Sequence, residues 1–149
     1  MTDLAAWLEA AALAQFLKQS RWVYPLVNAG HILGIALLIG AVVPMDLRLA
    51  GLMRRGSAGQ AVALLRPFAA AGLALALSCG SLLFVTQATD YIGNPWFRWK
   101  MALLAAALLN AALHPRLQHL QLPRQRLAAS LSLALWPAVL ICGRMIAYS

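Results

Sequence analysis

Four long apolar runs are the feature of this sequence that most constrains its fold. They cover about residues 22–45, 67–88, 96–114 and 127–148, and each is close to the roughly 20 helical residues that cross a hydrocarbon core. Hydrophobic residues make up 62% of the 149-residue chain, whereas soluble domains contain roughly 45–50%. The sequence therefore predicts an all-α, integral membrane four-helix bundle that forms a single transmembrane domain over residues 1–149.

The segment before the first run has a different pattern. Residues 3–19 mix apolar and polar side chains at near-helical spacing, which predicts an amphipathic helix lying at the membrane interface. The apolar positions include Leu4, Trp7, Leu8, Phe16 and Leu17, and the polar ones Glu9, Gln15 and Lys18. The opening MTDLAAW has an acid and no basic n-region, so we do not expect a cleavable signal peptide.

Basic residues lie mainly in the short connections between the apolar runs, and the formal net charge is +8. They form no basic stripe with interleaved aromatics, so a nucleic-acid partner is not expected. Seven fall in two connections, which the positive-inside rule places in the cytoplasm, leaving both termini on the outer side of the membrane. The seven are Arg48, Arg54, Arg55, Arg66, Arg116, Arg124 and Arg126. Asp46 and Arg48 are expected to cap and anchor the cytoplasmic end of the first span, and Arg98 and Lys100 to snorkel to the outer interface.

His31 is an ionisable residue inside the first apolar run. Counted from Arg21 at 1.5 Å per residue, it lies roughly 15 Å deep in the hydrocarbon. Such residues usually face the bundle interior with a partner. Asn28 precedes His31 by one turn, and Gly30 and Gly34 form a small-xxx-small pair beside it, so the polar face coincides with a closely packed one. His31 is therefore either a structural residue of a non-enzymatic scaffold subunit or a cofactor ligand.

A b-type haem in a helical bundle needs imidazole ligands, and His31 is the first candidate. His114 is the candidate second ligand, with Asn110 one turn before it. His114, however, lies roughly 20 Å along its span from Lys100, near the cytoplasmic end, and untilted helices would separate the two histidines by about 10 Å or more in depth. His119 lies in the cytoplasmic turn and fits less well. Either the helices are strongly offset or His31 pairs with another group.

Soft ligands give a third possibility. Cys79 and Cys142 lie about 12 Å and 9 Å from the outer ends of their spans, in the same half as Met145 and His31. Thiolate, thioether and imidazole groups suit copper(I), although cysteine and methionine are also ordinary apolar fillers. No phosphate-binding loop, HExxH motif or close acidic pair is present, so enzymatic activity is not expected. Haem binding, a scaffold role and copper handling stay open at this point.

Three stretches carry a family resemblance. WLEAAALAQFLKQSRWVYPLVNAGHILG, DLRLAGL and NPWFRWK, with Asn110 and His114, resemble an uncharacterised family of small bacterial four-helix inner-membrane proteins along nearly the whole chain. HILGIALLIG is similar to spans of copper-resistance membrane proteins and of membrane b-type cytochromes. The first resemblance implies the fold and the bacterial inner membrane, with both termini in the periplasm, and no activity. The second, which covers one span, favours a haem or copper group at His31. The lipid bilayer is the expected partner, with other membrane subunits or a second copy as further candidates.

Overall fold

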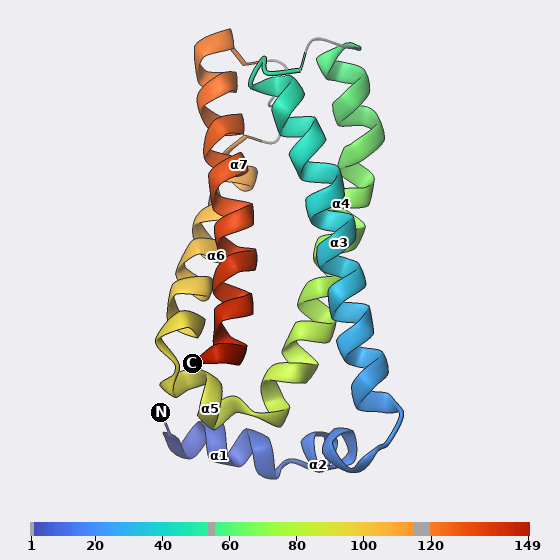
Figure 1. Cartoon of the computed structure of the whole chain (residues 1–149), viewed down its shortest axis with the longest axis vertical. Helices are drawn as coiled ribbons and strands as arrows, with labels where there is room; N and C mark the ends of the chain where they lie inside the picture. The colour runs from blue at the N-terminus through green and yellow to red at the C-terminus, as the bar shows by residue number, and fades with distance from the viewer. Residues whose placement is uncertain (1, 54–55, 115–119) are drawn as a thin grey trace.

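The structure is a computed structural model that describes residues 2–53, 56–114 and 120–149, and these residues form helices and connections without a strand. Four long helices, α3 (Val23–Leu49), α4 (Ala58–Thr86), α6 (Pro95–Leu113) and α7 (Leu122–Met145), run side by side along the molecule (Figure 1). Three short ones, α1 (Thr2–Ala10), α2 (Ala12–Gln19) and α5 (Ala88–Gly93), gather at one end, and a 3-10 turn, Ile146–Tyr148, follows α7. The all-α prediction is confirmed.

Three helices in the described part of the chain are long and apolar enough to cross a membrane. They are α3, α4 and the stretch Leu122–Tyr148, which comprises α7 and the turn after it. Such spans are what a multi-pass membrane protein requires. Helix α6, which carries Arg98 and Lys100 near its start, is not one of the three, so its predicted crossing of the membrane stays a prediction.

Two helix starts are set by capping side chains. Helix α4 begins at Ala58 and not near residue 67, because Ser57 and Gln60 form a reciprocal capping box that satisfies the first backbone N–H groups. Pro67 consequently lies within the helix. The start of α6 lies close to the predicted residue 96, because the helix begins at Pro95. Asn94 caps it, and its side chain accepts a hydrogen bond from the backbone N–H of Trp96 at 2.9 Å.

The amphipathic segment is two helices, whereas the sequence predicted one. Ala11 adopts an extended conformation (φ −60°, ψ 143°) and separates α1 from α2. Helix α1 packs against α4 and α5, and α2 packs against α4. Ala5 of α1 and Ala88 of α5 are fully buried. The Glu9 carboxylate accepts a hydrogen bond from the backbone N–H of Thr89 at 2.7 Å. This bond ties α1 to α5.

The long helices pack as two pairs, α3 with α4 and α6 with α7, and α3 also contacts α7. In the first pair the backbones touch: a Cβ added to Gly34 would lie 2.5 Å from the Ala76 nitrogen, and one added to Gly72 would lie 2.5 Å from the Leu38 nitrogen. The predicted close approach at Gly34 is therefore confirmed. The central apolar cluster comprises Leu38, Ala41, Val42, Ala69, Ala107 and Trp136.

Candidate functional site

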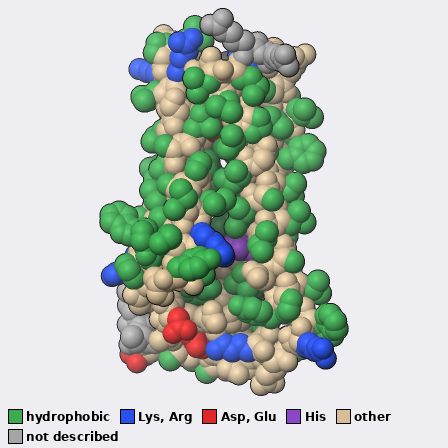
Figure 2. Space-filling view, viewed as in Figure 1, with side chains coloured by type: hydrophobic (Ala, Val, Ile, Leu, Met, Phe, Trp, Pro, Cys, Tyr) green, Lys and Arg blue, Asp and Glu red, His purple; other side chains and the backbone are tan. Residues whose placement is uncertain are grey.

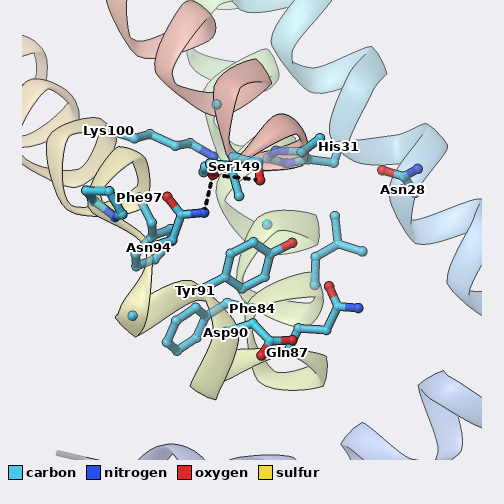
Figure 3. A pocket seen from close by; sticks show the side chains of 17 residues that line it. Asn28, His31, Phe84, Gln87, Asp90, Tyr91, Asn94, Phe97, Lys100 and Ser149 are labelled. Carbon is cyan, nitrogen blue, oxygen red and sulfur yellow. Dashed lines mark hydrogen bonds between the residues drawn. The ribbon is translucent and has the colours of Figure 1, made fainter.

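A cavity of about 800 Å³ lies where the two helix pairs meet α5 and the end of the chain. Five helices contribute to its wall, so residues distant in the sequence face one space. Those used below are Asn28, His31, Gly80, Phe84, Tyr91, Asn94, Phe97, Lys100 and Ser149 (Figure 3). Figure 2 shows an opening on this face in which a histidine and a basic side chain lie between apolar surfaces.

His31 is fixed by a hydrogen bond between helices. Its Nδ1 lies 2.8 Å from the backbone carbonyl oxygen of Ala76 on α4. Because a carbonyl oxygen can only accept, this contact assigns the proton to Nδ1 and leaves a lone pair on Nε2. A Cβ added to Gly80 would lie 2.9 Å from His31 Cε1, so the imidazole occupies the space that this glycine provides. Metal-binding histidines are commonly oriented by such a backbone acceptor.

Lys100 enters the cavity from α6, opposite His31. Figure 3 shows the two side chains pointing toward each other, and they are close enough to interact electrostatically. Lys100 Nζ has no hydrogen-bond or salt-bridge partner among the residues that the structure describes. A half-buried ammonium group without a counter-charge is costly. The cavity is therefore suited to a ligand that carries an anionic group.

Three aromatic rings form an apolar wall. Phe84 of α4, Tyr91 of α5 and Phe97 of α6 stack on one another with centroid separations of 6.1, 5.4 and 5.3 Å. Burial, with smaller effects of Tyr24 and Asp90, raises the pKa of Tyr91, so its phenol remains a neutral donor at neutral pH. Such a wall favours a ligand with an extended apolar surface beside its charged group.

The remaining polar residues lie along the cavity wall. Asn94 Nδ2 donates a hydrogen bond to Ser149 Oγ at 2.7 Å, which ties the end of the chain to the start of α6. Asn28, predicted to share a face with His31, does line the same cavity. The cavity wall also contains the carboxylate of Asp90, on α5, which forms no salt bridge with Lys100.

His114 lies apart from His31. It lines a second cavity, of about 200 Å³, near the opposite ends of the long helices. Its Nδ1 is 2.9 Å from the backbone oxygen of Asn110, whose own side chain donates to Ala128 O at 3.1 Å. The structure thus does not bring the two candidate haem ligands together. His119 lies outside the described residues.

The candidate copper ligands do not share a cavity with His31. Cys79, Cys142 and Met145 line neither cavity, and a Cβ added to Gly30 would lie 3.0 Å from Cys79 Sγ. Cys142 is buried within α7. Among the described residues, no group of three or more His, Cys, Asp or Glu side chains is placed to hold a metal ion. Copper handling stays a prediction.

Sequence reasoning missed the roles of Lys100 and Asp46. Lys100 was expected to reach the interface, but it lies in the large cavity; Asp46 was expected to cap a helix end, but it is buried and lines the small one. A signal was present for the lysine. Positions two apart on a helix face different sides, so Arg98 and Lys100 cannot both point outward, and Arg98 is the exposed one.

Comparison with known proteins assigns no relative. No protein family matches the chain, and neither the curated proteins nor the solved structures contain a significant match. The fold and the cavities themselves define the class: an all-helical protein with three candidate membrane spans and a cavity that places a histidine opposite a lysine.

Proposed function

We propose that this protein is a bacterial inner-membrane protein that binds b-type haem in the large cavity, with His31 as its one histidine ligand. The observation that carries the proposal is the 2.8 Å contact between His31 Nδ1 and Ala76 O. It orients the imidazole and leaves Nε2 as the free ligand atom, which is the arrangement of a metal-binding histidine.

The other lining residues fit the same group. Haem has a broad apolar face and two carboxylates, and it supplies one-electron redox chemistry when bound. Lys100 supplies the positive charge for a carboxylate, and the wall of Phe84, Tyr91 and Phe97 supplies apolar contact. The volume of about 800 Å³ is within the usual range for cofactor pockets, roughly 300–1,000 Å³. His114 takes no part in this site.

The same proposal places the chain in the bilayer as a four-helix bundle, with α6 as the fourth crossing and α1 and α2 at the periplasmic interface. Both chain ends lie at the same end of the molecule (Figure 1), which supports an even number of crossings. Arginines flank the connections at the other end, the side that the positive-inside rule assigns to the cytoplasm. The described ones are Arg48, Arg66, Arg124 and Arg126.

Visible spectroscopy tests haem binding. Protein purified from haem-supplemented cells should show a Soret band at about one haem per chain. The band should be absent in His31→Ala, and haem should bind at least about tenfold more weakly to Lys100→Ala because an ion pair is lost. His114→Ala is the matched control and should bind haem as the wild type does. Folded wild-type protein without visible absorbance after supplementation would eliminate the redox proposal and leave the scaffold role.

A further inference from the structure

The second cavity contains a buried acid that the haem proposal does not use. Asp46 lies on α3 and is 1% exposed. Its Oδ2 is buried and accepts no hydrogen bond from any described residue. The chain has four acidic residues, and Asp46 is the one within the long helices. A carboxyl oxygen that is buried and has no partner among the described residues requires one from a proton, a water molecule or a ligand.

The groups around Asp46 come from three other helices. The other charged and titratable groups that line the cavity are Arg66 of α4 and His114 of α6. Helix α7 contributes Ser132, whose hydroxyl is a hydrogen-bonding neighbour of the Asp46 carboxyl. Because His114 Nδ1 lies against a carbonyl oxygen, its Nε2 is an acceptor. Asn110 Nδ2 is used by Ala128 O, which leaves Oδ1 as an acceptor as well. Asn110 Oδ1 and His114 Nε2 are therefore acceptors at this cavity, whereas Arg66 and Ser132 carry donors.

These surroundings favour a proton over a metal ion. An ionised carboxylate in an apolar region is costly, and such a group usually becomes neutral by taking up a proton. Once protonated, Asp46 can donate a hydrogen bond to a neighbouring acceptor such as Asn110 Oδ1. A metal ion would lack ligands here, because no group of three or more His, Cys, Asp or Glu side chains among the described residues is placed to hold one. The volume of about 200 Å³ is enough for several waters at roughly 30 Å³ each.

We propose that the Asp46 cavity is a proton-binding site. It exchanges protons with water at the arginine-bearing end of the molecule, which is the end that carries Arg48, Arg66, Arg124 and Arg126. Hydronium transfers one proton to the Asp46 carboxylate and leaves a neutral carboxylic acid and a water molecule. Along α3 the clustered residues Leu38, Ala41 and Val42 lie between Asp46 and His31. The site is thus separate from the large cavity, and it does not depend on haem.

Infrared difference spectroscopy tests this site. The full chain is placed in ether lipids, which lack carbonyl groups, and titrated with acid in H₂O and in D₂O. The proposal expects a carbonyl band of a protonated acid that grows as the pH falls, shifts in D₂O and is absent in Asp46→Asn. It should persist in the combined control Asp3→Asn, Glu9→Gln, Asp90→Asn, which removes the other three acidic side chains.

Two further results decide the remaining cases. Ser132→Ala retains the acid but removes its hydroxyl neighbour, so the proposal expects the band to shift in frequency. This variant also serves if Asp46→Asn does not fold, and an unshifted band in Ser132→Ala would then overturn the proposal. A band that survives in folded Asp46→Asn would overturn it as well. Loss of the wild-type band on adding Na⁺ at fixed pH would show that the site binds a metal cation in place of the proton, and it would overturn the proposal.

Discussion

At the scale of single residues, the position of the His31 ring depends on two backbone features of α4. The carbonyl of Ala76 holds Nδ1, and the absence of a side chain at Gly80 leaves room for the ring. The position of His31 along its helix could be predicted by counting residues, because rise per residue is constant in a helix. The tautomer could not, because it depends on a carbonyl on another helix.

Gly80→Ala should displace the His31 ring, since the new Cβ would lie 2.9 Å from Cε1 and the end of a side chain moves more easily than a backbone. The hydrogen bond to Ala76 is then lost or lengthened. We expect haem affinity to fall about tenfold, the effect of roughly 1.4 kcal/mol. Ser81→Ala, at the neighbouring exposed position, is the control. Equal haem affinity in the two variants would contradict the role of Gly80.

Glu9 gives a pH-dependent contact at the end of the molecule. The backbone N–H of Thr89, with help from Lys18, holds the pKa of Glu9 below its ordinary value of 4.5. A lowered pKa means that the ionised form stabilises the folded state above the unfolded pKa and that this is lost as pH falls through the folded value. The Tm of the wild type should therefore exceed that of Glu9→Gln at pH 7. The difference should shrink below pH 4.5, and a constant difference would refute the assignment.

At the scale of elements, the α3–α4 pair is the part of the fold that the sequence predicted best. Small residues four apart permit close helix packing in lipid whatever the rest of the fold, and Gly34 does meet Ala76. The start of α4 and the break at Ala11 were missed. The break at Ala11 accompanies contacts of α1 and α2 with α4 and α5, which have no local sequence signal. The capping box at Ser57 and Gln60 was a readable signal for the start of α4.

Gly72→Ala should destabilise the helix pair. The new Cβ would lie 2.5 Å from the Leu38 backbone nitrogen, so the helices must move apart. Overpacking of this kind costs about 1–3 kcal/mol, to be measured by reversible unfolding in mixed detergent micelles. Gly40→Ala is the matched control because its Cβ meets no atom within 4 Å. If both variants unfold alike, the backbone contact does not stabilise the pair.

At the scale of the whole molecule, the two ends differ in charge and in chemistry. One end has the large cavity, both chain ends and the acids Glu9 and Asp90; the other has the small cavity and most of the arginines. We expect the arginine-bearing end in the cytoplasm. Reporter fusions after Gly59 and after Ser149 should give cytoplasmic and periplasmic signals, respectively. A periplasmic signal at Gly59 would reverse the orientation and the side from which each cavity is reached.

We propose that one histidine, His31, binds haem. Resonance Raman spectroscopy of the reduced protein tests this directly, because an iron–histidine stretching band would report a haem held by a single histidine. We expect one such band, shifted by ¹⁵N-histidine labelling, unchanged in His114→Ala and absent in His31→Ala. A six-coordinate spectrum of two histidines that is lost in His114→Ala would contradict it, since the structure places His31 and His114 in different cavities.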